Sequence, residues 1–277
     1  MVQRALCDNS LVPIVESQLI YDNAASLPKR GTSFARKRFE LHYKRALGKW
    51  EHPYAVIFDC SNYFGSISSQ RAFDMISTLY RSIARTGREK QDVERILTVL
   101  RIFVLDEPHL GLGNQTSQTM AIWYLNKVDH WCMSQGFYGR YMDDAYCFCK
   151  NREQAERVLA GYERHVNQLG LRLNKRKTRI VDCRTGQLTF LKRVYSVQDD
   201  GSILIRMHHK ALRASRRHAR NLIRSYDGVH VGLRTVQDSW TSHESTLSGL
   251  THRRGLCARE KAWYRRHCEM RKLAFHP

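Results

Sequence analysis

The pattern of hydrophobic and polar positions predicts buried strands that alternate with amphipathic helices. Residues 54–59 read Tyr-Ala-Val-Ile-Phe-Asp, an apolar run that is typical of a strand buried on both faces and that ends in an acid. Residues 137–149 place two apolar runs on either side of Asp143-Asp144, which predicts a hairpin with the acidic pair at its turn. Apolar side chains at helical spacing predict helices over residues 73–83, 93–104 and 116–133.

The second half of the chain continues this alternation. Residues 151–170 predict a helix that Asn151 caps, that Gln154 supports from the first turn, and that ends at Gly170. Short strands are predicted over residues 171–173, 179–181, 189–197 and 202–207, with Gln-Asp-Asp-Gly as the turn between the last two. A basic amphipathic helix is expected near residues 211–226.

Composition bounds the class of protein. A chain of 277 residues is long enough for one large domain or two coupled subdomains, and 42% hydrophobic with 26% charged residues is typical of a folded globular protein. No apolar run of about 18 residues is present, and acids interrupt the first twenty residues, so we expect a cytoplasmic protein without a membrane partner. Eight cysteines without a C-x-x-C spacing favour a reducing compartment and structural packing over a zinc site.

Charge gives the first indication of a partner. The 46 Lys and Arg exceed the 26 Asp and Glu by 20, and residues 206–277 contribute 11 of that excess, with 16 basic and 5 acidic residues. A polyanion is the natural partner of such a chain, and nucleic acid is favoured because its phosphates release counterions when cations approach. The alternative is a solvated basic face. The candidate nucleic-acid-binding residues on the helix at 211–226 are Arg213, Arg216, Arg217, Arg220 and Arg224.

Three carboxylates lie where structure alone has little use for them. Asp59 ends a buried strand, and Asp143 and Asp144 lie at the hairpin turn, so all three should meet at the rim of one sheet. Buried negative charges repel one another unless a cation compensates them, and hard carboxylate oxygens favour Mg²⁺. Two such ions could support an in-line phosphoryl displacement. The second acidic pair, Asp199-Asp200, is followed by Gly201 and indicates only a turn.

Residues 138–144, Tyr-Gly-Arg-Tyr-Met-Asp-Asp, resemble the catalytic hairpin of reverse transcriptases. Further motifs follow in the family's order, so the resemblance covers about residues 20 to 197. The form Gly113-x-x-x-Ser117-Gln118 is similar to that of enzymes of diversity-generating retroelements, a bacterial and phage branch related to group II intron and retron enzymes. Leu112 and Gln118 depart from the wider family pattern, so the resemblance does not imply high copying fidelity. The matching segments are residues 58–67, 111–131, 169–181 and 189–197.

The resemblance implies roles for individual residues. Asp59, Asp143 and Asp144 would bind two Mg²⁺ ions, with the backbone carbonyl of Cys60 as a further ligand. Adjacent strand residues point to opposite faces, which makes Asp144 the weaker ligand candidate of its pair. Lys177 would protonate the pyrophosphate leaving group. Substrate contacts are implied for Lys29, Arg30 and Arg36 at the triphosphate, Phe64 beneath the sugar, Gly113, Asn114, Gln115 and Ser117 at the template and incoming base, and Met142 at the primer terminus.

The predicted fold is α+β, a right-hand polymerase with an antiparallel-sheet palm, short fingers and a helical thumb. The fingers would occupy residues 1–52, the palm residues 53–200 with finger-side helices at 69–110, and the basic thumb residues 201–277. Only about twenty residues precede the finger-like segment at 21–31, so an accessory protein or structured RNA is expected to complete the template channel.

The predicted activity is RNA-directed DNA polymerisation, in which a DNA or RNA primer on an RNA template is extended with dNTPs. Phe64 would exclude a 2′-hydroxyl, although the same residue could simply belong to the core. Two alternatives stay open: a polymerase that uses ribonucleotides or no template, and a catalytically weak nucleic-acid-binding subunit of a retroelement or defence ribonucleoprotein. The sequence does not distinguish among diversification, mobility and antiviral defence as the biological role.

Overall fold

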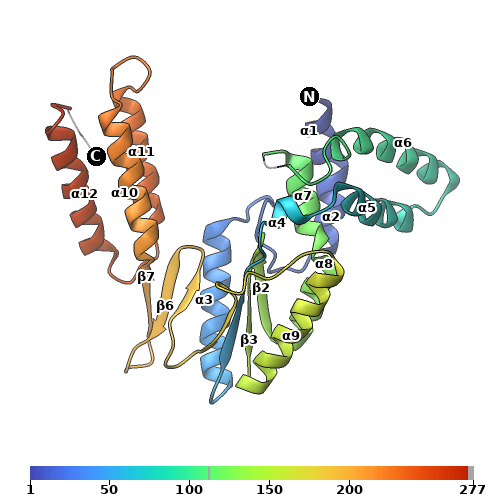
Figure 1. The fold of residues 1–277 in the computed structure, drawn as a ribbon, viewed down its shortest axis with the longest axis horizontal. Helices are drawn as coiled ribbons and strands as arrows, with labels where there is room; N and C mark the ends of the chain where they lie inside the picture. The colour runs from blue at the N-terminus through green and yellow to red at the C-terminus, as the bar shows by residue number, and fades with distance from the viewer. Residues whose placement is uncertain (112, 274–277) are drawn as a thin grey trace. The chain divides into compact units, whose positions relative to one another are not determined.

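The computed structural model describes residues 1–111 and 113–273, and the chain divides into two compact units, Met1–Gly186 and Gln187–Pro277 (Figure 1). Both units combine helices with antiparallel strands, so the α+β class is confirmed. The division falls at residue 186 and not at the predicted palm–thumb boundary at residue 200. The assignment of fingers, palm and thumb stays a prediction.

The first unit is built around a four-stranded antiparallel sheet in the order β2-β3-β1-β4. The predicted strand at 54–59, the hairpin at 137–149 and the strand at 179–181 are confirmed. Residues 55–58 of β1 are buried, as expected for an apolar run covered on both faces. The strands are β1 (Tyr54–Phe58), β2 (Phe137–Tyr141), β3 (Asp144–Cys149) and β4 (Arg179–Asp182).

Helices cover both faces of this sheet (Figure 1). On one face, Phe39 of α3 (Thr32–Lys49) contacts the ring of Tyr146 edge-on, with a centroid separation of 4.7 Å. On the other face, Tyr162 of α9 (Arg152–Gln168) stacks on Phe58 at 4.0 Å. Alternate residues of β3 point to opposite faces, so Cys147 and Cys149 pack together in the core under α9 as free thiols. The sheet is therefore held rigidly from both sides.

The predicted helices over residues 73–83 and 93–104 are confirmed, whereas the helices within residues 2–18, 32–49 and 63–66 were not predicted from the sequence. The expected single helix over 116–133 is two helices, because the chain turns at Leu125, where φ is −96° and ψ is 9°. The predicted strand at 171–173 is wrong: the segment forms only an isolated bridge between Cys60 and Leu173. The helices are α1 (Val2–Leu6), the π-helix η1 (Cys7–Leu11), α2 (Val12–Gln18), α4 (Tyr63–Ser66), α5 (Ser69–Ile83), α6 (Gly87–Val104), α7 (Gln115–Tyr124) and α8 (Asn126–Gln135).

The predicted caps of α9 are present. The side chain of Asn151 accepts a hydrogen bond from the Gln154 backbone N–H at 2.9 Å. Gly170 follows the helix with φ of +80°, a left-handed conformation that glycine adopts without strain. The Gln154 side chain, however, accepts from the Lys150 backbone N–H and not from that of Asn151. Gly170 thus ends α9, and the loop that carries Lys177 follows it.

The second unit contains a three-stranded antiparallel sheet followed by three helices. Its core includes Trp240 and Tyr264, whose rings meet edge-on at 5.0 Å. Asp199-Asp200 lies in the β6–β7 connection, where Gly201 has φ of +79°, so this second acidic pair is the turn that the sequence predicted. The elements are β5 (Leu188–Phe190), β6 (Arg193–Val197), β7 (Ile203–Met207), α10 (His209–Arg224), α11 (Leu233–Thr246) and α12 (Arg253–Glu269).

In the described part of the chain, none of the helices combines the length and the apolar character that crossing a membrane would require.

Candidate functional site

The register between β1 and β3 brings the predicted carboxylates to one end of the sheet. Phe58 pairs with Ala145 in this antiparallel ladder. The next position along both chains places Asp59 opposite Asp144, the first residue of β3. Asp143 precedes it in the β2–β3 turn. The period-two geometry of two neighbouring strands thus delivers three acids from distant parts of the sequence to a common edge.

The register between β1 and β4 adds a cation from the other side. Ile57 pairs with Arg179, and the same register continued by two residues places Lys177 opposite Asp59. Lys177 Nζ donates to Asp59 Oδ2 at 2.8 Å. The backbone carbonyl of Asp59 also accepts from the Asn174 N–H at 2.8 Å. The loop that precedes β4 therefore fixes the backbone of Asp59 and supplies the positive charge beside its carboxylate.

Asp59 is buried, with 4% of its surface exposed. Its Oδ1 atom is also buried and has no hydrogen-bond partner. An unsatisfied carboxylate oxygen at such a position costs on the order of 1–3 kcal/mol unless a ligand or cation satisfies it. The partner of Oδ2 is mostly solvent-exposed, since 65% of the Lys177 side chain is accessible. Oδ1 is thus the oxygen of this carboxylate that has no partner among the described residues of the protein.

Electrostatic repulsion is concentrated at this edge. Burial, together with the neighbouring charges of Asp143 and Asp59, raises the pKa of Asp144 to about 6. Burial also raises the pKa of Asp143, and the negative charge of Asp59 raises it as well. The hydrogen bond with Asp59 raises the pKa of Lys177, which keeps its ammonium group charged. The three carboxylates therefore carry more negative charge than one lysine balances, and an added cation would relieve it.

The carboxylate oxygens of Asp59, Asp143 and Asp144 suit Mg²⁺, but these side chains are not arranged as a complete set of metal ligands. Among residues 1–111 and 113–273, no three His, Cys, Asp or Glu residues are grouped so that they could hold a metal ion. Lys177 compensates Asp59 in this arrangement. Cys60 is buried, and burial raises the pKa of its thiol to about 12, so only its backbone carbonyl fits the predicted ligand set. Metal binding would require the carboxylates to turn toward a shared ion.

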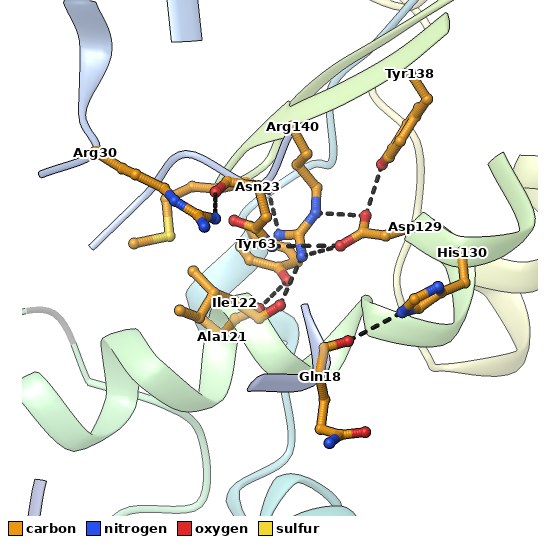
Figure 2. A network of polar contacts seen from close by, with 11 residues as sticks. Gln18, Asn23, Arg30, Tyr63, Ala121, Ile122, Asp129, His130, Tyr138 and Arg140 are labelled. Atoms are coloured by element: carbon orange, nitrogen blue, oxygen red, sulfur yellow. Dashed lines mark hydrogen bonds and ion pairs between the residues drawn. The ribbon is translucent and has the colours of Figure 1, made fainter. Parts of the chain in front are cut away.

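The turn between β2 and β3 has an unusual backbone. Met142 has φ of +55°, in the left-handed region that non-glycine residues rarely adopt. Its carbonyl accepts a hydrogen bond from Arg140 Nη1 at 2.9 Å. Figure 2 shows that Arg140 also bonds to Asp129 on α8, and neither side chain of this pair is exposed. The sequence indicates no role for Asp129, because a lone acid within a helical pattern gives no signal of a distant partner.

Phe64 lies on α4, directly after Tyr63. Its ring is half-buried, packs partly against the core of the first unit, and meets the Tyr63 ring edge-on at 5.9 Å. The Tyr63 hydroxyl donates to the carbonyl of Ala121 at 2.6 Å, which attaches α4 to α7 (Figure 2). Phe64 thus makes core contacts, and its predicted role beneath the sugar stays a prediction.

Residues of the segment from Gly113 to Ser117 make structural contacts within the protein. Gly113 has φ of +89°, and the space around its Cα is open, so its backbone conformation is what favours glycine there. Asn114 caps α7 by accepting from the Thr116 N–H at 2.9 Å, and Gln3 donates to the same oxygen. Ser117 is buried. Leu112, singled out by the sequence, lies outside the described residues.

Gln115 has a partner in the N-terminal helical region: its amide donates to Asp8 at 2.8 Å.

The predicted triphosphate cations differ in their surroundings. Arg30 donates to the carbonyl of Asn23 at 2.9 Å, whereas Lys29 is exposed. Arg36 is half-buried on α3. Lys29 is thus the most accessible of the three.

The predicted nucleic-acid face on α10 keeps four of its five arginines at the surface. Arg216 instead turns to Glu260 of α12, with Nε and Oε2 3.0 Å apart, and Glu260 is fully buried. Burial would raise the pKa of Glu260, but its contacts with His243 and Arg216 outweigh this effect and lower the pKa below its usual value. The exposed arginines are Arg213, Arg217, Arg220 and Arg224.

Comparison with known proteins agrees with this geometry. Residues 5–194 match the family model described as reverse transcriptase (RNA-dependent DNA polymerase). No curated protein matches the sequence. The solved structure of telomerase from Candida albicans in complex with a fragment of telomeric RNA is similar, with a TM-score of 0.54 and 14% identity over 96% of this chain and 47% of that chain.

Apo telomerase from Candida tropicalis is similar to the same degree, with a TM-score of 0.52 and 12% identity over 93% of this chain and 48% of that chain. At these identities the likeness shows a shared fold. The chain spans about half the length of either telomerase.

Proposed function

The chain belongs to the reverse transcriptase (RNA-dependent DNA polymerase) family, and from this premise we propose that it extends a primer 3′-hydroxyl with dNTPs on an RNA template. The observation that carries the proposal is the strand register, which brings Asp59, Asp143 and Asp144 to one sheet edge within the matched residues 5–194. Lys177 reaches the same edge from the adjacent strand. Carboxylates that can hold two metal ions suit phosphoryl transfer from a triphosphate, and a charged amine can protonate the leaving group.

Each residue of the site has a separate proposed role in the reaction. The three carboxylates would hold two Mg²⁺ ions, which when bound neutralise the α-phosphate and activate the primer hydroxyl. Lys177, whose raised pKa keeps it protonated at neutral pH, would give its proton to the pyrophosphate leaving group. Met142 would touch the primer terminus, and Phe64 would lie beneath the sugar. Lys29 supplies an accessible cation for the triphosphate.

The second unit would bind the template–primer duplex. The net charge of +20 and the exposed arginines on α10 favour a polyanionic partner. The candidate partners are an RNA template, a DNA or RNA primer, dNTPs, and an accessory protein or structured RNA. The Gly113-x-x-x-Ser117-Gln118 form supports a finer proposal, that the chain is an enzyme of the bacterial and phage branch related to diversity-generating retroelements. A cytoplasmic location is a separate part of the proposal.

The test is Mg²⁺-dependent incorporation of dNTPs on an RNA template with a DNA primer. Asp143→Asn should reduce incorporation by at least about 100-fold, which corresponds to about 2.7 kcal/mol of transition-state stabilisation. The matched control is Asp199→Asn in the exposed second acidic pair, which should incorporate like the wild type. Equal incorporation by the Asp143 variant and the wild type would contradict the assignment.

The same assay separates the alternatives. Strong salt-dependent binding without any Mg²⁺-dependent incorporation would indicate a non-catalytic nucleic-acid-binding subunit. Equal use of NTPs and dNTPs by the wild type would indicate a ribonucleotide polymerase. Phe64→Ala should increase ribonucleotide incorporation if the sugar lies on that ring.

A further inference from the structure

Arg140 and Asp129 form an ion pair that is completely buried, with no exposed side-chain surface on either residue. The contact is bidentate: Arg140 Nε donates to Asp129 Oδ1 at 2.7 Å, and Nη2 donates to Oδ2 at 2.6 Å. The Tyr138 hydroxyl also donates to Asp129 Oδ1 at 2.7 Å. A buried ion pair commonly adds little stability over an apolar pair of similar volume, because desolvation offsets the attraction. Its presence therefore calls for another explanation.

The remaining contacts of the guanidinium reach two separate backbone segments. Nη1 donates to the carbonyl of Met142 at 2.9 Å. Nη2 donates to the carbonyl of Ile122 on α7 at 2.6 Å (Figure 2). The flat fork of an arginine can serve three acceptors in fixed directions, and a lysine cannot. Arg140 thus joins α7, α8 and the β2–β3 turn through one side chain.

The contact with Met142 falls on the peptide that matters for the candidate chemistry. That carbonyl belongs to the peptide bond between Met142 and Asp143. Because the peptide unit is planar, fixing the direction of the carbonyl also fixes the orientation of the Asp143 backbone nitrogen. Met142 holds φ of +55°, a conformation that costs on the order of 1 kcal/mol or more for a residue with a side chain. Such a backbone persists only where surrounding contacts enforce it, and the Arg140 hydrogen bond is one such contact.

The same pair also reaches the segment that precedes the predicted triphosphate cations. The Arg140 backbone N–H donates to the carbonyl of Asp22 at 3.0 Å, and the Ala24 N–H donates to the Arg140 carbonyl at 3.0 Å. Asn23, between them, donates its side-chain amide to Asp129 at 3.4 Å, and its carbonyl accepts from Arg30 (Figure 2). The network therefore connects the catalytic hairpin to the strand-like segment before Lys29.

We propose that Arg140, oriented by Asp129, is a positioning residue that sets the conformation of the Met142–Asp143 peptide and thereby the direction of the Asp143 carboxylate. The proposal rests on the proposed polymerase function. Arg140 touches neither substrate nor metal in this role and acts only through the turn. Asp129 serves to hold the guanidinium in the one orientation that reaches the Met142 carbonyl.

Two variants separate positioning from stability. Arg140→Lys keeps a positive charge beside Asp129 but loses the fork that reaches Met142 and Ile122. Arg140→Met combined with Asp129→Leu replaces the ion pair with apolar side chains and removes the tether without leaving a buried charge. The matched control is Arg152→Lys, in an exposed pair with Glu156 in the same unit.

The readouts are thermal unfolding, single-turnover incorporation, primer–template affinity, and the NMR signal of the Met142 methyl group, assigned with Met142→Leu. Both Arg140 variants should lower the single-turnover rate at least about 10-fold, equivalent to about 1.4 kcal/mol, with primer–template affinity within about 2-fold of the wild type. The Met142 signal should shift or broaden in both, whereas that of exposed Met133 should not change.

Folded variants with an unchanged Met142 signal and an unchanged rate would overturn the proposal, and so would failure of both to fold, because the pair would then serve the fold alone. A wild type that incorporates no nucleotide would refute the polymerase function instead. The Met142 signal would still decide whether Arg140 sets the turn.

Discussion

Raising the pH through 6 should destabilise the metal-free protein, because Asp144 loses its proton in a place that disfavours the charge. Its pKa lies at about 6 against an ordinary value of 3.8, with burial as the main cause and Asp143 as the next. At about 1.4 kcal/mol per pKa unit, this difference corresponds to about 3 kcal/mol. The carboxyl is half-buried, so water screens part of that cost and the measured effect should be on the order of 1–3 kcal/mol.

The sign follows from linkage. The folded protein binds this proton more tightly than the unfolded chain, so the stabilisation is complete below about pH 3.8 and is lost as the pH rises to about 6. Other carboxylates titrate in the same range, so the contribution must be read as the difference between the wild type and Asp144→Asn. The variant should gain stability relative to the wild type between pH 4 and 7, and added Mg²⁺ should reverse that order at pH 7.

The assay is urea unfolding of both proteins between pH 4.5 and 7.5, with and without Mg²⁺, alongside a carboxyl-carbon NMR titration of Asp144. Asp143→Asn removes the second cause and should lower the pKa of Asp144, whereas Asp199→Asn in the exposed turn should leave it unchanged. A pKa near 4 in the wild type, or a stability difference that does not vary with pH, would refute the reasoning about crowded carboxylates.

Three further predictions concern other charged contacts. Lys177→Met should lower the incorporation rate at least about 10-fold while tightening Mn²⁺ binding, since the ammonium that occupies Asp59 is gone; weaker Mn²⁺ binding would contradict this. Glu260→Gln should destabilise the protein by about 1–3 kcal/mol at pH 7 in urea unfolding, and the difference should vanish as the pH falls through the lowered pKa of Glu260, below 4.5. Arg217→Gln should reduce the slope of log affinity against log salt for duplex binding by about 1, and an unchanged slope would remove Arg217 from the interface.

The sequence predicts the elements that carry the site because their signals are local. The apolar run ending in Asp59 and the two runs flanking Asp143-Asp144 define strands by periodicity, and antiparallel pairing of those strands makes their ends meet. The break at Leu125 gives no such signal, since the apolar positions before and after it continue one helical pattern. The break is visible only in the folded backbone, where Leu125 has φ of −96° and ψ of 9°.

Long-range polar contacts are the part that the sequence does not reveal. Asp129 and Arg140 are eleven residues apart on different elements, and no spacing rule distinguishes their pairing from that of any other acid and base. Asn114 and Gln115 look like free polar side chains in a loop, but partners more than 100 residues away engage both of them. Their predicted substrate roles came from a motif, which records residue types and not their neighbours in space.

The most direct test of the central claim is the binding of Mn²⁺, as a paramagnetic substitute for Mg²⁺, followed by electron paramagnetic resonance in the presence of primer–template and a dNTP. If Asp59, Asp143 and Asp144 together hold the catalytic ions, Asp59→Asn should weaken Mn²⁺ binding at least about 10-fold, or about 1.4 kcal/mol, while Asp199→Asn binds like the wild type. Identical binding curves for Asp59→Asn and the wild type would show that the carboxylates at this sheet edge do not share a metal.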